Sequence, residues 1–180
     1  MTKADALGSV HSNSMVSPSE VAVFYRELDK LPDKGRMLEI GTGFGHSTAF
    51  FAIAKPEWTI YTVDCYGSVG ELPNVYSNPG HWVDGVGVLA VIHYLEKHEV
   101  NNVIQIVGDS AKIPWELKID ALFIDGDHEY SCVKRDFERF SPFVKEGGVV
   151  LFHDIVFPGV EKFTGELGVE KFVTVGVWRK

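Results

Sequence analysis

The chain has 180 residues, a mass of 20.0 kDa, a formal net charge of -8 and a pI near 5.3. This length fits one domain spanning residues 1–180 with its own hydrophobic core, and the acidic balance argues against nucleic acid, whose phosphates attract basic surfaces. The two cysteines cannot form a disulfide framework, no apolar run approaches the roughly 20 residues needed to span a membrane, and the first residues lack a signal-peptide core, so we expect a cytoplasmic protein with no membrane partner.

The first predicted helix begins at a strong capping signal. Residues 1–16 are polar, small and without periodicity, and we expect them to form a flexible arm. The following Ser17-Pro18-Ser19-Glu20 provides an N-cap, a proline in the first turn and the glutamate of a capping box. Apolar residues then recur at helical spacing as far as Leu31, and Pro32 closes the segment.

A glycine-rich turn follows the first predicted strand, Arg36 to Ile40. Three glycines, Gly41, Gly43 and Gly45, alternate with other residues before a helix that we expect to reach Lys55. Glycine is needed where the backbone takes a positive φ or where a ligand approaches closely, and the N–H groups that begin a helix attract a negatively polarised group. Glu39, near the end of the strand, favours a ligand that also carries positive charge or hydrogen-bond donors.

The second predicted strand, Thr59 to Val63, ends on Asp64. An acid at this place, about 20 residues past the glycines, binds ribose hydroxyls in nucleotide-binding α/β folds. Residues 65–84 are rich in turn formers and aromatic residues and are too long for a simple connection, so we interpret them as a wall or lid of a binding site. A helix over residues 86–98 follows, with an expected inner face formed by Val86, Leu89, Ile92, His93 and Leu95.

The remaining strands each end in polar residues. We expect strands at Val103–Val107, Ile119–Ile124, Val149–Phe152 and Phe172–Trp178, and a helix from Tyr130 to Phe140. Apolar strands separated by helices predict an α/β fold with a doubly wound, mostly parallel sheet and helices on both faces. Because little sequence separates Asp154 from the last strand, we expect an abbreviated C-terminal strand pair.

Five acids fall at the ends of the predicted strands. Ligands of doubly wound sheets bind at the carboxyl ends of the strands, so these residues predict a site at one edge of the sheet. The five are Glu39, Asp64, Asp109, Asp125 and Asp154.

The glycine spacing bears on the cofactor. The dinucleotide fingerprint requires its third glycine one residue later, where this chain has His46, and Glu39 would repel a pyrophosphate. S-adenosylmethionine fits better, because it has no phosphate and carries an ammonium, a sulfonium, ribose hydroxyls and an adenine. An NAD-dependent oxidoreductase is the disfavoured alternative.

The segment Leu38–Gly45 resembles motif I of class I S-adenosylmethionine-dependent methyltransferases. The segments Phe123–Tyr130 and Gly147–Asp154 together resemble the small O-methyltransferase group of catechol, caffeoyl-CoA and macrolide-sugar type enzymes. The resemblance implies that Glu39 and the glycines face the methionine moiety, Asp64 the ribose, and Asp109 with Ser110 the adenine. The full set of expected cofactor-binding residues is Glu39, Gly41, Thr42, Gly43, Gly45, Asp64, Cys65, Asp109, Ser110 and Asp125.

Methyl transfer needs positioning of two groups and loss of a proton from the acceptor hydroxyl, which a divalent metal or a side-chain base can assist. In catechol-type enzymes an acid after strand four and an Asp-Asn pair after strand five hold the metal. Asp125 and Asp154 match the first two ligands, but the third position is Ile155, which cannot coordinate.

Two readings of the site therefore stay open. In one, Asp127, His128 or His153 replaces the missing ligand of Mg²⁺ or another divalent cation, with Asp125, Asp154 and Asp127 as the expected set. In the other there is no metal and His128, which aligns near the catalytic lysine of the catechol-type enzymes, is the base. The expected catalytic residues are His128, Asp125 and His153. The plainer alternatives are that Asp127 caps the following helix and that His153 is a satisfied core histidine.

The sequence thus predicts a methyltransferase acting on a hydroxyl of a small molecule, which would be its main partner. The alternatives are a protein of the same fold with different chemistry and a non-catalytic S-adenosylmethionine-binding subunit. A homo-oligomer that covers the short sheet edge is a further expectation.

Overall fold

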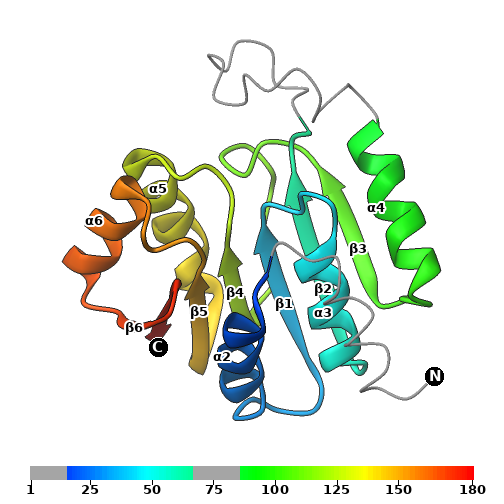
Figure 1. Ribbon diagram of the computed structural model, residues 1–180, viewed down its shortest axis with the longest axis horizontal. Helices are drawn as coiled ribbons and strands as arrows, with labels where there is room; N and C mark the ends of the chain where they lie inside the picture. Colours follow the sequence, from blue (N-terminus) through cyan, green and yellow to red (C-terminus); the bar gives the residue numbers. More distant parts are fainter. Residues whose placement is uncertain (1–15, 67–85) are drawn as a thin grey trace.

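The computed structural model describes residues 16–66 and 86–180, which form a sheet with helices on both faces (Figure 1). Within these ranges the sheet has seven strands in the order β3-β2-β1-β4-β5-β7-β6. The strands are β1 (Gly35–Ile40), β2 (Trp58–Asp64), β3 (Val103–Val107), β4 (Ile119–Ile124), β5 (Val144–Phe152), β6 (Glu170–Phe172) and β7 (Val175–Arg179). The first five are parallel, whereas β7 runs antiparallel to both β5 and β6.

Five α-helices are present in the same ranges. They are α2 (Pro18–Leu28), α3 (His46–Ala54), α4 (Val86–Lys97), α5 (Tyr130–Phe140) and α6 (Pro158–Leu167), with a short 3₁₀ turn (Ser141–Phe143) after α5. None of the helices in the described part is long and apolar enough to cross a membrane.

Two hydrophobic cores lie on opposite faces of the sheet. Along β1, Met37 packs with α2, α3 and α4, whereas its neighbour Leu38 packs with α5 and α6. This alternation follows from the two-residue period of a strand, and the strands read as continuous apolar runs because both faces are covered. The α/β, doubly wound architecture predicted from the sequence is confirmed.

The first helix begins as its sequence predicts. Ser17 is the N-cap, its backbone N–H donates to Glu20 Oε2 at 2.5 Å, and Glu20 N–H donates to Ser17 Oγ at 3.4 Å, which completes a capping box. The helix ends at Leu28, earlier than expected, but Leu31 is still buried in the core.

The predicted inner face of α4 is wrong at three of its residues and confirmed at Leu95. Leu89 is 66% exposed and Ile92 41% exposed, and His93 also faces solvent. The buried side of the helix contains Leu95, as expected, together with Val91, which was not expected there. The helix is apolar over most of its circumference, so periodicity does not select one face.

The C-terminal third differs from expectation in three places. Strand β5 begins at Val144, before the expected start at Val149, and continues through a register shift around Gly147, whose φ is +77°. The expected single last strand is a hairpin, β6 and β7, with Val173 at φ +57° in its turn. Helix α6 was not expected, although Pro158 in its first turn and Gly168 at its C-cap are the usual end signals of a helix. The abbreviated strand pair is confirmed, since β6 has only three residues.

Candidate functional site

The glycine turn joins β1 to α3 and lies against the end of β4. Gly41, Gly43 and Gly45 have φ values of +95°, +53° and +82°, a region that side chains disfavour. A β-carbon on Gly41 would lie 2.1 Å from the carbonyl oxygen of Asp125, so this position also requires a close backbone approach. A β-carbon on Gly43 would meet no atom of the described residues within 4 Å, so these residues leave open space at the turn.

Glu39 lies beneath the turn and is fully buried. Its carboxylate accepts hydrogen bonds from the hydroxyls of three residues at 2.5–2.6 Å: Ser47, Thr48 and Thr62. Because the Thr62 hydroxyl donates to Glu39, the Thr42 hydroxyl is the donor in its 2.6 Å contact with Thr62. Burial raises the pKa of Glu39 to about 7, although these hydroxyls act in the opposite direction. Direct contact of Glu39 with the methionine moiety stays a prediction.

Asp64 at the end of β2 holds the glycine turn in place. Its Oδ2 accepts the N–H groups of Thr42 and Gly43, both at 3.0 Å, and its Oδ1 accepts the N–H of Tyr66 at 2.8 Å. Cys65, the next residue along the chain, is half-buried. The carboxylate therefore lies beside the open space at Gly43, and its role toward a ribose stays a prediction.

Asp109 and Ser110 follow β3 in a loop. Asp109 Oδ1 accepts the N–H of Ala111 at 2.9 Å, and its Oδ2 lies 3.3 Å from Lys112 Nζ. Ser110 Oγ donates to Asp136 Oδ1 at 2.8 Å, and burial raises the pKa of Asp136 above its usual range. The hydroxyl of Ser110 is thus bound to α5 in this structure.

Asp125 ends β4 beside His153, which is 7% exposed at the end of β5. The Nδ1 of His153 lies 3.0 Å from Asp125 Oδ1, and its Nε2 lies 3.1 Å from Glu20 Oε1. Burial alone would lower the pKa of His153, but the hydrogen-bonded carboxylates stabilise the imidazolium and raise the pKa to about 12. Both ring nitrogens therefore act as donors, and neither has a free lone pair.

A second histidine lies on the other side of Asp125. The Nε2 of His128 is 3.9 Å from Asp125 Oδ1 and 3.5 Å from Asp154 Oδ2, and this buried nitrogen has no hydrogen-bond partner among residues 16–66 and 86–180. The ring stacks on Phe157, with centroids 4.5 Å apart and planes at 24°. One ligand atom from each of Asp125, His128 and Asp154 lies within 4.8 Å of the other two, a spacing that suits a metal ion.

The structure does not bring Asp127 into this cluster. Its Oδ1 accepts the N–H of Glu129 at 2.8 Å in the turn that leads into α5. The backbone of Asp154, the third residue of the cluster, is left-handed, with a φ of +53° that is uncommon for a residue other than glycine. Ile155 is buried in the core and contributes nothing to the cluster.

Sequence reasoning missed several residues of the site. Glu20 reaches His153 from α2, but its place in a capping box concealed any other role. Ser47, Thr48 and Thr62 bind Glu39, and only the position of the first two directly after the glycine turn signalled them. The predicted wall or lid over residues 65–84 lies outside the described residues beyond Tyr66, as does the expected flexible arm except for Val16.

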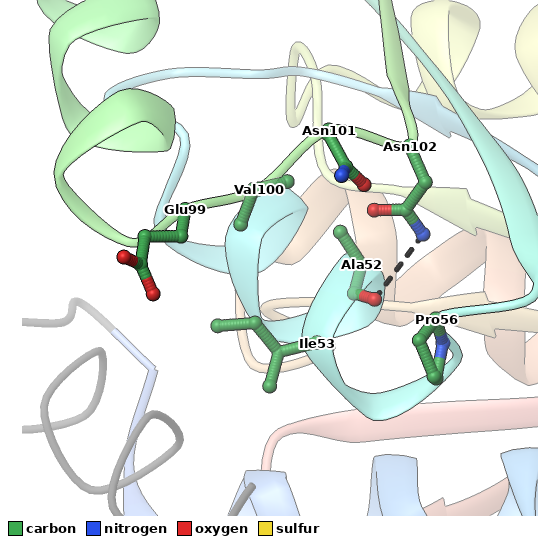
Figure 2. Close-up of a pocket in the computed structure, with 7 residues that line it drawn as sticks. All are labelled: Ala52, Ile53, Pro56, Glu99, Val100, Asn101 and Asn102. Atoms are coloured by element: carbon green, nitrogen blue, oxygen red, sulfur yellow. Dashed lines mark hydrogen bonds between the residues drawn. The ribbon is translucent and has the colours of Figure 1, made fainter. Parts of the chain in front are cut away.

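Two surface hollows lie away from these residues. One of about 250 Å³ is lined by Ala52 and Ile53 in the last turn of α3, by Pro56 after it and by residues 99–102 before β3 (Figure 2). Asn102 Nδ2 donates to the carbonyl oxygen of Ala52 at 3.2 Å across it. The other, about 500 Å³, adjoins it at Pro56. The first hollow lies where β2 and β3 begin, and the second lies between α2 and the segments that lead into β1 and β2, so both are at the end of the sheet opposite the glycine turn.

Comparison with known proteins identifies the family. The model of a family described as a methyltransferase domain matches residues 38–155, which include the glycine turn and the cluster around Asp125. An uncharacterised protein of Acanthamoeba polyphaga mimivirus is 26% identical over 144 residues, 75% of this chain; the chain spans only 62% of that relative's length.

Solved structures share the fold. The O-methyltransferase NovP aligns with a TM-score of 0.73 at 15% identity over 93% of this chain and 81% of its own. A candidate caffeoyl-CoA O-methyltransferase from Staphylococcus aureus aligns with a TM-score of 0.63 at 17% identity, over 95% of this chain and 73% of its own. An rRNA methylase from Streptococcus thermophilus also matches, with a TM-score of 0.58 at 14% identity over 87% and 83%, so the fold leaves the methyl acceptor open. With its sheet order and its glycine turn, the chain belongs to the methyltransferase-domain family, in the class I S-adenosylmethionine-dependent group.

Proposed function

We propose that the protein transfers the methyl group of S-adenosylmethionine to a hydroxyl oxygen of a small molecule. The observation that carries this proposal is the contact between the glycine turn and Asp125, because it places the expected cofactor turn directly beside the cluster Asp125, His128 and Asp154. An in-line methyl transfer requires this adjacency between the donor and the groups that bind the acceptor.

The chain's own residues supply the cofactor side. The backbone at Gly43 is open to a ligand, and Asp64 beside it offers carboxylate oxygens to ribose hydroxyls. Buried acids such as Glu39 make the environment favourable for the positively charged sulfonium and ammonium groups. The family assignment leaves the NAD-dependent alternative without support.

The residues around Asp125 also fit a divalent cation. Two carboxylates and one imidazole nitrogen converge, and within the described part of the chain the buried Nε2 of His128 has no hydrogen-bond partner. We propose that Asp125, His128 and Asp154 hold the metal, with His128 in place of the ligand that Ile155 cannot provide. A divalent cation bound there would lower the pKa of an acceptor hydroxyl and orient it. If no metal binds, the same Nε2 is the side-chain base.

His153 has a different role in this proposal. Both its ring nitrogens are hydrogen-bonded to carboxylates, so it holds Asp125 in place and does not accept a proton from the acceptor. The small-molecule acceptor, the cytoplasmic location and the possible homo-oligomer stay predictions.

Calorimetric titration and mass spectrometry test the proposal. We expect S-adenosylhomocysteine to bind and NAD not to bind. With S-adenosylmethionine, a panel of phenols, catechols and sugars should yield O-methylated products, and matched amines should not. Binding of NAD alone, or methylation only of the amines or of ribosomal RNA, would contradict the proposal. Activity unchanged by EDTA would select His128 as the base over the metal.

A further inference from the structure

Glu20 connects three distant parts of the chain next to the site. Its Oε1 accepts from His153 Nε2 at 3.1 Å and from the hydroxyl of Thr174, which lies in the turn between β6 and β7. Its Oε2 accepts the N–H of Ser17 at 2.5 Å. Glu20 is only 5% exposed, so these contacts are shielded from water.

Helix capping does not account for this arrangement. A capping box needs only the contact between Glu20 and Ser17, and such residues usually lie at the surface of a helix end. Here the side chain is buried and spans from α2 to the end of β5. Burial would raise the pKa of Glu20, but the hydrogen bonds from His153, Thr174 and Ser17 lower it to about 2, so a carboxylate is present at neutral pH.

The contacts continue from Glu20 to the reacting end of the sheet. His153 donates through Nδ1 to Asp125 Oδ1 at 3.0 Å, so Glu20 and Asp125 bind opposite sides of one imidazole ring. Thr174 adds a second link, because its carbonyl oxygen accepts the N–H of Ile155 at 3.0 Å, directly after Asp154. Carboxylates that lie behind a binding residue in this way fix its orientation.

We propose that Glu20 is a positioning residue for methyl transfer, which orients Asp125 through His153. This inference rests on the proposed function of Asp125. Through Glu20, helix α2 takes part in the site. Thr174 supports the same arrangement, because its hydroxyl donates to Glu20. Sequence spacing gives no hint of the relationship, because Glu20 and His153 are 133 positions apart.

Glu27 on the same helix provides a matched control. Its side chain is equally buried and forms ion pairs with Arg26, Lys30 and Arg179, at 2.8–2.9 Å. Glu27→Gln therefore removes a buried carboxylate from α2 without touching His153. A Gln at position 20 has one acceptor oxygen, so it cannot satisfy Ser17, His153 and Thr174 together.

The test compares Glu20→Gln with Glu27→Gln in the full chain, at a temperature where both proteins are folded. We expect kcat to fall about 10- to 100-fold in Glu20→Gln, with the S-adenosylhomocysteine Kd and the acceptor KM within about twofold of wild type. Glu27→Gln should lower Tm but leave kcat within about twofold. Equal losses of kcat in the two variants, or an unchanged kcat in Glu20→Gln, would overturn the inference.

A second pair and a spectroscopic measurement complete the design. Should Glu20→Gln not fold, Thr174→Val removes the hydroxyl that binds Glu20, and Thr174→Ser keeps it; only Thr174→Val should lower kcat. If the wild-type protein transfers no methyl group, the proposed function fails, but NMR of the His153 ring N–H groups and of the Asp125 carboxyl carbon still tests the positioning. Glu20→Gln should shift both signals and Glu27→Gln neither; unchanged signals in Glu20→Gln would refute it.

Discussion

The α-carbon of Gly41 lies so close to Asp125 that a β-carbon at this position would be 2.1 Å from the Asp125 carbonyl oxygen. The N–H of Gly41 donates to Val63 O at 2.8 Å, and the N–H of Asp125 donates to Ile40 O at 2.9 Å. The end of β1 is therefore held between β2 and β4. The close approach of the Gly41 and Asp125 backbones thus aligns the glycine turn with the cluster around Asp125.

Gly41→Ala should destabilise the fold severely. The methyl group would overlap backbone atoms that cannot move aside, and φ +95° is unfavourable for alanine. We expect a loss of about 3 to 5 kcal/mol in the free energy of unfolding, measured by urea denaturation.

Gly43→Ala is the control for this prediction. Its φ is +53° and none of the described residues has an atom within 4 Å of the added carbon, so the expected cost is that of the left-handed backbone, about 1 to 2 kcal/mol. The protein should fold but bind S-adenosylhomocysteine more weakly, because the methyl group occupies the open space at the turn. Equal stability of the two variants would show that the contact between Gly41 and Asp125 is not tight.

Glu39 should give the stability a specific pH dependence. Burial raises its pKa from 4.5 to about 7, so the folded state holds the proton more tightly than the unfolded state does. Its contribution to stability is therefore greatest below pH 4.5 and declines as the pH rises to about 7, by roughly 3 kcal/mol. Chemical denaturation at a series of pH values measures this decline.

Glu39→Gln isolates the effect, because the amide does not titrate. The difference in unfolding free energy between wild type and variant should change across this pH window and stay constant above it. A constant difference from pH 4 to 8 would mean that Glu39 titrates normally in the fold.

The sequence was sufficient to predict that Asp64 and Asp125 lie at the same edge of the sheet. Strands β2 and β4 are runs of β-branched and apolar residues that end directly on Asp64 and Asp125, and parallel strands bring such ends together. The dinucleotide fingerprint needs its third glycine where this chain has His46. This difference and the acid Glu39 then indicated S-adenosylmethionine as the cofactor. These signals are local, so they can be read without knowing the packing.

Other features depend on packing that local sequence does not encode. The apolar residues around α4 do not distinguish Val91, which is buried, from Ile92, which is exposed. The contact of Glu20 with His153 exists only because α2 docks against the end of β5. Similarly, the placement of Asp127 outside the cluster depends on the turn that leads into α5, where its side chain binds Glu129.

Substitutions of His128 and of Asp127 should have sharply different effects on the affinity for a divalent metal ion. His128→Ala removes a nitrogen that lies 3.5 Å from Asp154 Oδ2, and we expect the Kd for Mn²⁺ to rise at least about tenfold. Titration of the protein with Mn²⁺, followed by electron paramagnetic resonance, measures the free ion directly.

Asp127→Asn is the comparison for this prediction. Its amide oxygen can still accept the N–H of Glu129, so both the turn and the Mn²⁺ affinity should be retained. Weaker binding in Asp127→Asn than in His128→Ala would restore Asp127 as a ligand. No detectable binding by the wild-type protein would favour His128 as a base.

Ile155 cannot be converted into the ligand that catechol-type enzymes have after strand five. The side chain is 4% exposed and packs in the core beside Gly176. Ile155→Asn would bury an amide among apolar groups, and we expect a loss of about 3 to 5 kcal/mol in stability without tighter Mn²⁺ binding. Ile155→Val keeps the position apolar and should cost only about 1 kcal/mol. If Ile155→Asn were as stable as Ile155→Val and bound Mn²⁺ more tightly, the side chain would have to face the cluster, and His128 would not be needed as its third ligand.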